Sequence, residues 1–336
     1  MSSITRCQLH EGLCDVKRPA LAMITGLLSA GPLAGQAAPV ADSHQHLFSP
    51  AIVALLASGD GGPPAITARD VVALLDSGGI QRAVILSVAY MYGSPSRTVA
   101  HEYAKVRGEN DWTAAQAHEY PDRLIAFCGF NPLKDYALDE LAHCSADPKL
   151  AGGIKLHFGN SDVQLDNPKH VERLRRVFRA ANQHRMAIVV HMRASISRKR
   201  PYGAAQARIF VEQLLSEAPD VPVQVAHLAG TGPGYDDPSA DSAMAFLAEA
   251  VQRKDPRTHR LWFDVAGIVD SSVTAAQAAL MVRRIRRAGV ERILYGSDAA
   301  VLESMRPREE WAAFRRLPLT SDEFDRIAGN VPPYFR

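Results

Sequence analysis

The 336-residue chain is long enough for a large hydrophobic core, and it suits one barrel-sized domain as well as two small ones. Its net charge of +2 at pH 7 gives no reason to expect nucleic acid or a membrane surface as a partner. The sequence also lacks a zinc-finger spacing and a basic stripe rich in aromatic residues. We therefore expect a small-molecule partner and no nucleic acid.

The first 38 residues differ from the rest of the chain. Lys17 and Arg18 precede a short apolar stretch, and Gly- and Ala-rich sequence follows as far as Ala38. This order is typical of an export signal, with a disordered leader as the alternative. Gly31-Pro32 interrupts the stretch, which is too short for a stable membrane span. We expect a leader over residues 1–38, one domain over 39–336, and a periplasmic or secreted protein if the leader is a signal, otherwise a cytoplasmic one.

Beyond the leader, short apolar runs rich in Val and Ile alternate with segments of helical spacing. Helical spacing is clearest over residues 168–184 and 275–288. The predicted strands are residues 40–48, 83–89, 124–130, 153–158, 187–192, 221–228, 261–266 and 293–297. Eight buried strands that alternate with helices predict parallel βαβ units and a (β/α)8 TIM barrel. An open doubly wound sheet is the alternative, but no Gly-rich phosphate loop follows the first strand.

Polar side chains end several of the predicted strands. The first strand carries Asp42, His44 and His46, which share one face because strand side chains alternate. The later strand ends carry Lys155, His157, His191, His227 and Asp298. Buried ionisable groups are costly unless they are paired or bind a metal, and neutral imidazole suits zinc and its neighbours. In a TIM barrel these strand ends form the active site, so the pattern predicts a metal-dependent centre there.

Six segments carry a resemblance to a known family. They are Asp-Ser-His-Gln-His (42–46), Gly-Ile-Lys-Leu-His (153–157), Val-Val-His (189–191), Val-Ala-His-Leu-Ala-Gly (225–230), Phe-Asp-Val-Ala-Gly (263–267) and Leu-Tyr-Gly-Ser-Asp (294–298). In this order they resemble the amidohydrolase superfamily, and within it the amidohydrolase-2 group of hydrolases and decarboxylases. The resemblance covers about residues 38 to 336 and implies a metal-dependent barrel of the amidohydrolase type.

The resemblance implies a ligand set for one divalent metal, which we expect to be zinc, with manganese as the alternative. The implied ligands are His44, His46, His191 and Asp298, which would leave a position for water. Asp298 would also accept a proton from metal-activated water. His227 would polarise a substrate carbonyl or shuttle a proton, and is therefore predicted to be catalytic together with Asp298.

Three further residues are predicted to contact a small anionic substrate. They are Lys155, His157 and Arg193. Lys155 would attract the substrate as a compact cation, but the resemblance also implies that a carboxylated Lys155 would instead bridge a second metal, with His157 as a further ligand.

Several supporting residues remain open from sequence alone. Asp42 is expected to orient a neighbouring group, whereas Asp264 either orients a ligand histidine or is a solvated carboxylate. Tyr90, Tyr92 and Trp112 either wall the pocket or pack in a lid.

The predicted function is a metal-dependent hydrolase that directs activated water at a carbonyl-like carbon of an ester, lactone or amide. A metal-dependent non-oxidative decarboxylase of a small carboxylic acid is the alternative, and an exported non-catalytic binding protein is the third. A homodimer is possible, because two-fold dimers are the commonest closed assembly.

Two cysteines lie outside the leader. Cys128 is on a predicted strand and Cys144 on a predicted helix. We expect two buried free thiols, with pairing in an oxidising compartment as the alternative.

Overall fold

The computed structural model describes residues 37–57, 64–232, 237–299 and 306–335. The predicted leader therefore lies outside the described residues, apart from positions 37 and 38. From residue 37 onward, the described residues belong to one compact unit.

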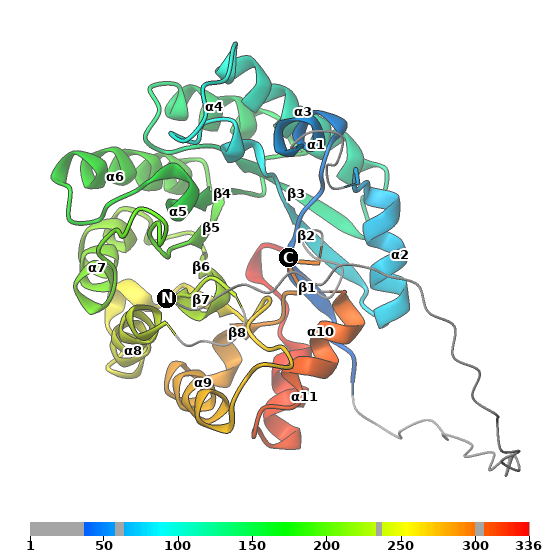
Figure 1. The fold of residues 1–336 in the computed structure, drawn as a ribbon, viewed down its shortest axis with the longest axis vertical. Coiled ribbons are helices and arrows are strands. Elements are labelled where there is room, and N and C mark those ends of the chain that lie inside the picture. The colour runs from blue at the N-terminus through cyan, green and yellow to red at the C-terminus, as the bar shows by residue number, and fades with distance from the viewer. Residues whose placement is uncertain (1–36, 58–63, 233–236, 300–305, 336) are drawn as a thin grey trace, which may run out of the picture. The chain divides into compact units, whose positions relative to one another are not determined.

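Eight parallel strands follow one another around a nearly closed barrel, in the order of the sequence (Figure 1). They are β1 (Ala41–Gln45), β2 (Arg82–Leu86), β3 (Leu124–Gly129), β4 (Gly153–His157), β5 (Ala187–His191), β6 (Val223–Val225), β7 (Leu261–Asp264) and β8 (Ile293–Leu294). The backbone N–H of Ser43 donates to the carbonyl of Tyr295 at 2.9 Å, which joins β1 to the segment after β8. The predicted TIM barrel is confirmed, and several strands are shorter than predicted.

Helices surround the ring of strands (Figure 1). The α-helices are α1 (Pro50–Leu56), α2 (Ala68–Gly78), α3 (Glu102–His118), α4 (Ala137–Ala146), α5 (Phe158–Ser161), α6 (Pro168–Gln183), α7 (Ala204–Ile209), α8 (Pro238–Gln252), α9 (Ala275–Ala288), α10 (Pro307–Phe314) and α11 (Ser321–Gly329). Short helical turns include η1 (Ala89–Met91), η4 (Ala226–Ala229) and η8 (Pro333–Phe335). The predicted helices over 168–184 and 275–288 correspond to α6 and α9. No helix in the described part of the chain is both long and apolar enough to cross a bilayer.

Two separate apolar clusters stabilise the barrel. The larger one packs the outward faces of the strands against the helices. The smaller one contains Val84, Leu86, Phe127, Ala187 and Val189, with the partly buried Ile125, Tyr334 and Phe335 against it. Alternate residues of a strand point to opposite faces, so one cluster lies inside the barrel and the other outside it.

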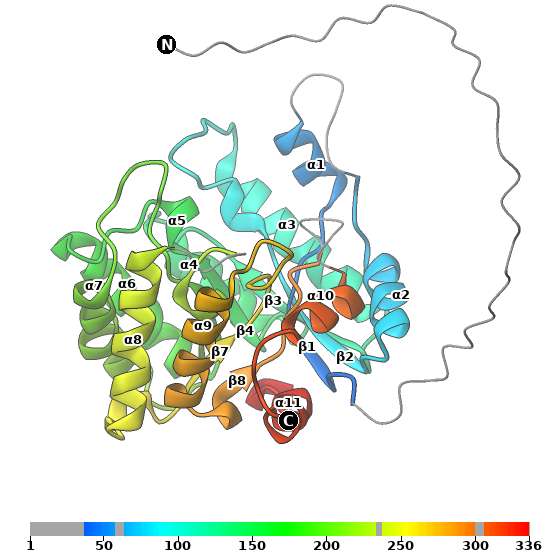
Figure 2. The ribbon, with the colours of Figure 1, turned by 60° about the horizontal axis from the view of Figure 1, so that its bottom comes forward.

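The site lies at the end of the barrel where the strands end. Figure 2 shows α1, which follows the carboxyl end of β1, at the opposite end of the barrel from α11. The segment after α11 ends in η8, whose two aromatic residues join the inner cluster. The C-terminal segment therefore contacts the barrel interior from the end opposite the strand-end histidines.

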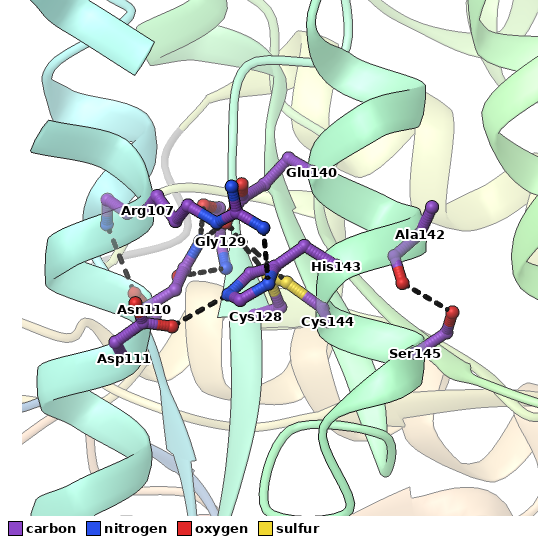
Figure 3. Close-up of a disulfide and its surroundings, with 12 residues drawn as sticks. Arg107, Asn110, Asp111, Cys128, Gly129, Glu140, Ala142, His143, Cys144 and Ser145 are labelled. Atoms are coloured by element: carbon purple, nitrogen blue, oxygen red, sulfur yellow. Dashed lines mark hydrogen bonds and ion pairs between the residues drawn. A yellow bond between two sulfur atoms is a disulfide. The ribbon is translucent and has the colours of Figure 1, made fainter. Parts of the chain in front are cut away.

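The prediction of two free thiols is wrong. Cys128, at the end of β3, and Cys144, in α4, form a disulfide with a Cα–Cα distance of 6.2 Å (Figure 3). The pairing arises because α4 packs back across the strand that precedes it, which sequence separation alone does not reveal. Glu140 is fully buried beside the two sulfurs, and Asn110 Nδ2 donates to its Oε1 at 2.7 Å.

Candidate metal centre and active site

The two histidines of the first segment have their proton positions set by their partners. His44 Nδ1 lies 3.0 Å from Asp264 Oδ2, and His46 Nδ1 lies 2.5 Å from the carbonyl of Leu86. Burial opposes ionisation of Asp264, but the adjacent His44 and the hydrogen bonds it receives outweigh burial and hold its pKa below the usual range. A carboxylate and a carbonyl can only accept, so each neutral ring carries its proton on Nδ1 and leaves Nε2 unprotonated.

His227 has the same arrangement but lies just beyond β6, in the turn η4. Its Nδ1 donates to the carbonyl of Ala266 at 2.7 Å, and its backbone N–H donates to Asp264 Oδ1 at 2.8 Å. The neutral ring therefore also has an unprotonated Nε2. Its backbone φ of 54° lies in the left-handed region, which is costly for a non-glycine residue and is often found at functional sites.

Asp298 follows β8 and also has a left-handed backbone, with a φ of 56°. Its backbone N–H donates to the carbonyl of His44 at 2.8 Å. Its Oδ1 lies 3.4 Å from His46 Nε2 and 4.0 Å from His44 Nε2. Within the described residues, this buried oxygen has no hydrogen-bond partner. A buried carboxylate oxygen without a partner is costly, so the chemistry of this oxygen fits a ligand of a cation.

Gly296 makes the approach of Asp298 to His44 possible. A Cβ at position 296 would lie 2.8 Å from the Cβ of His44 and 3.1 Å from that of Ala266. Contacts this short would force backbone to shift, so the glycine lets the segment after β8 pack directly against β1.

The ligating atoms of His44, His227 and Asp298 lie within 4.8 Å of one another. With His46 added, the group offers three unprotonated Nε2 atoms and the unpartnered Oδ1 of Asp298. These nitrogen and oxygen atoms match the ligands of a catalytic divalent cation. His191 lies at the edge of this group, with its ring centroid 5.1 Å from that of His227. The compact triad thus includes His227, which was predicted to be catalytic and not a ligand.

Lys155 lies inside the same cluster. Its Nζ is 3.0 Å from His44 Nε2, and the residue is 1% exposed. Burial lowers the pKa of Lys155 to about 8, although Asp264 and Asp298 favour its charged form. At neutral pH most of this amine is therefore a cation beside the predicted ligands.

His157 has the opposite tautomer to the three histidines above. Its Nδ1 accepts a hydrogen bond from the backbone N–H of Asn160 at 3.1 Å, so its neutral ring carries the proton on Nε2. That nitrogen can donate to a substrate but cannot ligate a metal without losing its proton. The ring stacks on His191 with 3.9 Å between centroids, and Tyr90 lies 5.0 Å away on η1.

Burial favours the neutral form of four of the site histidines by lowering the pKa of each. It lowers the pKa of His44, and it lowers the pKa values of His46, His157 and His191 well below the usual value. The Lys155 cation acts in the same direction on all four pKa values, and neighbouring histidines do so for His46, His157 and His191, whereas Asp264 and Asp298 oppose the shift in the pKa of His44. Neutral rings are the form in which histidine binds metals, so the site is prepared for a cation at neutral pH.

Two aspartates support the site from behind. Asp264 orients His44 and His227, which resolves the question that the sequence left open. Asp42 accepts from the backbone N–H groups of His44 and Ser297, at 3.0 and 3.1 Å. Burial raises the pKa of Asp42 to about 6, although hydrogen bonds from Ser297 and its neighbours oppose this. Asp42 therefore ties β1 to the segment after β8, as expected.

Arg193 is buried but already has a partner. Its Nε lies 2.5 Å from Asp237 Oδ2, and its guanidinium lies over the ring of Tyr202 at 4.7 Å. Asp237 also caps the first turn of α8, where it accepts from the backbone N–H of Ser239 at 2.9 Å. A substrate carboxylate would have to compete with Asp237. Sequence reasoning missed this partner because 44 residues separate the two.

Of the aromatic residues considered, only Tyr90 reaches the site. Tyr92 is buried near Glu109, and burial together with that carboxylate raises the pKa of Tyr92 to about 12. Trp112 lies within α3 and packs against the outer apolar cluster.

Comparison with known proteins agrees with this geometry. The family described as Amidohydrolase (Amidohydro_2) matches residues 41–330. The chain belongs to the Amidohydrolase family. Members of this family are hydrolases and decarboxylases, and they bind a divalent metal. No curated protein matches the chain.

Solved structures of the same fold include enzymes of both kinds. A 5-carboxyvanillate decarboxylase from Sphingomonas paucimobilis shares 15% identity over 87% of this chain and 97% of its own, with a TM-score of 0.59. A probable 2-pyrone-4,6-dicarboxylic acid hydrolase from Acinetobacter baumannii, with citric acid bound, shares 17% over 86% and 96%, with a TM-score of 0.55. A 5-carboxyvanillate decarboxylase from Novosphingobium aromaticivorans, with bound manganese, shares 13% over 87% and 95%, with a TM-score of 0.57. At these identities the likeness shows the fold alone.

Proposed function

We propose that this amidohydrolase is a metal-dependent hydrolase whose centre is formed by His44, His46, His191 and Asp298, with His227 beside them. The observation that carries the proposal is the buried, unpartnered Asp298 Oδ1, which lies 3.4 Å from His46 Nε2. We propose zinc as the metal, since nitrogen and carboxylate ligands suit it, with manganese as the alternative.

A divalent cation in this centre would supply Lewis-acid polarisation and lower the pKa of a water molecule to about 7. Asp298 would hold the cation through its carboxylate or serve as a proton acceptor, since its Oδ1 accepts no hydrogen bond from the described protein groups. The unprotonated Nε2 of His227 either accepts a proton or adds a ligand. Because Nδ1–H of His227 donates to the carbonyl of Ala266, Nε2 of the neutral ring has no proton to donate. His227 could therefore polarise a substrate carbonyl only after Nε2 is protonated.

We infer that the substrate is small and anionic. Lys155 offers a buried ammonium group and His157 an N–H donor on the same side of the cluster. Tyr90 is buried and lies next to His157. Arg193 is the weakest of the predicted contacts, since Asp237 already compensates its charge.

A non-oxidative decarboxylase is the second candidate. The position of Lys155 beside His44 favours it, because a substrate carboxylate could be held there without an attacking water. Two of the structural neighbours described above are 5-carboxyvanillate decarboxylases, which supports including aromatic carboxylic acids in a screen.

Product analysis separates the two reactions. Metal-loaded protein would be screened against lactones, esters and aromatic carboxylic acids in water labelled with oxygen-18. Hydrolysis incorporates the label into the acid product and releases no carbon dioxide. Carbon dioxide release without label in the remaining product would reject the hydrolase and support the decarboxylase. Asp298→Asn is the matched variant, since it keeps the shape of the side chain and removes its charge.

A further inference from the structure

A hydrogen-bonded chain links the C-terminal segment to the candidate metal centre through the inside of the barrel. We propose that Tyr334 is a positioning residue, which sets the orientation of His44 through Gln224 and Asp264. The inference rests on the proposed metal site, but it concerns a residue at the opposite end of the barrel from that site.

The first link is at the inner apolar cluster. Tyr334 Oη lies 2.5 Å from Gln224 Oε1, and its ring packs edge-on against Phe127 with 4.9 Å between centroids. Gln224 is 1% exposed and lies in the middle of β6. An amide oxygen buried this deeply needs a donor, and the phenol supplies it.

The second link joins Gln224 to the support of the metal centre. Its Nε2 donates to Asp264 Oδ2 at 2.6 Å, and the same oxygen lies 3.0 Å from His44 Nδ1. Nε2 also lies 3.3 Å from Ser43 Oγ. One carboxylate oxygen therefore serves both the amide and the imidazole, so a displaced amide changes the hydrogen bond that holds His44.

The direction of the amide explains the role of Tyr334. Asp264 requires the NH2 end of Gln224, which points Oε1 toward the interior at the other end of the barrel. Tyr334 satisfies that oxygen, so the amide keeps both hydrogen bonds in one conformation. Without the phenol, Oε1 is left buried without a donor. This costs free energy, which favours rotation of the amide away from Asp264.

The C-terminal segment is also held in place by contacts that do not belong to this series of hydrogen bonds. The guanidinium of Arg82 lies over the ring of Phe335 at 5.4 Å, and Phe335 packs against the inner cluster. A Tyr334→Phe variant therefore keeps the ring contacts and removes only the hydroxyl. Tyr136→Phe is the matched control, because the Tyr136 hydroxyl donates to Glu102 at 2.6 Å and neither residue belongs to the hydrogen-bonded series that ends at His44.

The test measures metal affinity by titrating zinc or manganese into metal-free protein under competition with a chelator. Removing a direct support of a metal ligand typically lowers affinity 10–100-fold. Tyr334 acts two residues beyond the direct support Asp264, so we expect Tyr334→Phe to weaken binding about three- to tenfold, and Tyr136→Phe to leave it unchanged. Gln224→Met should weaken binding at least as much, and the double variant should be no weaker than Gln224→Met alone, because both changes break one chain.

A second readout does not need bound metal. In metal-free protein, the His44 Nδ1–H proton should give a downfield nuclear magnetic resonance signal, and Tyr334→Phe should shift it or speed its exchange with water. Tyr136→Phe should do neither. If the wild-type protein binds metal and Tyr334→Phe changes neither affinity nor this signal, the role of Tyr334 is overturned and the proposed function stands. If the wild-type protein binds no metal, the proposed function fails, and the signal alone decides the role of Tyr334.

Discussion

Replacing Glu109 with glutamine should change how the stability of the protein depends on pH. Glu109 lies on α3 and is 3% exposed, with Ser49 Oγ at 2.5 Å from its Oε2. Its other oxygen has no hydrogen-bond partner in the described part of the chain. Burial raises the pKa of Glu109 from 4.5 to about 7, although the hydrogen bonds from Ser49 oppose this.

The sign follows from proton binding. The folded protein holds this proton more tightly than the unfolded chain, so the stability it contributes is complete below about pH 4.5 and is lost as the pH rises through about 7. The interval between these pKa values corresponds to at most about 3 kcal/mol of unfolding free energy. Glu109→Gln removes the titration and keeps a group that can bond to Ser49.

We therefore expect the variant to gain stability relative to the wild type between pH 5 and pH 9, by up to about 3 kcal/mol. Urea unfolding at several pH values in this range measures the difference. Glu119→Gln, an exposed change just beyond the same helix, is the control and should give curves parallel to the wild type. Parallel curves for Glu109→Gln would refute the claim that a buried carboxyl titrates near neutrality at this position.

Three other changes test separate parts of the structure. Asp264→Asn should lower metal affinity about 10–100-fold, because it removes the charged partner of His44 Nδ1; unchanged affinity in a chelator titration would contradict the assigned orientation. Lys155→Gln should leave the metal content at one ion per chain by elemental analysis, since His157 presents an N–H; two ions in the wild type and one in the variant would instead indicate a bridging, carboxylated lysine. The Cys128→Ala/Cys144→Ala double variant should lose about 3 kcal/mol in urea unfolding, the value expected for a closed loop of about 15 residues, and reduction of the wild type should have the same effect; no change would mean that the disulfide does not stabilise the fold.

The barrel was predictable because most of its strands are short apolar runs, whereas its helices are apolar on one face only. The runs that became β2 and β5 consist largely of Ala, Val, Ile and Leu, and α6 buries Val171, Leu174 and Val177 at helical spacing. Strand ends were less predictable. The predicted strand over 221–228 stops at Val225, since His227 and Leu228 adopt left-handed backbone conformations in η4. Tertiary hydrogen bonds that His227 donates to Asp264 and to the carbonyl of Ala266, and not local propensity, hold that turn.

The site residues were predictable because chemistry in this fold lies at strand ends. Their partners were not. Gln224 bonds to Asp264 across 40 residues, and Arg193 bonds to Asp237 across 44. Tyr334 bonds to Gln224 across 110 residues. No periodicity in the sequence marks such pairs, since each depends on where two distant elements meet. The disulfide was missed for the same reason.

Metal content is the most direct test of the proposed centre. Elemental analysis would compare purified wild-type protein, after reconstitution with zinc or manganese, with a His44→Ala/His46→Ala double variant that is shown to be folded by circular dichroism. The proposed centre predicts about one divalent ion per chain in the wild type and almost none in the variant. Equal metal content in both proteins, or none in the reconstituted wild type, would contradict it.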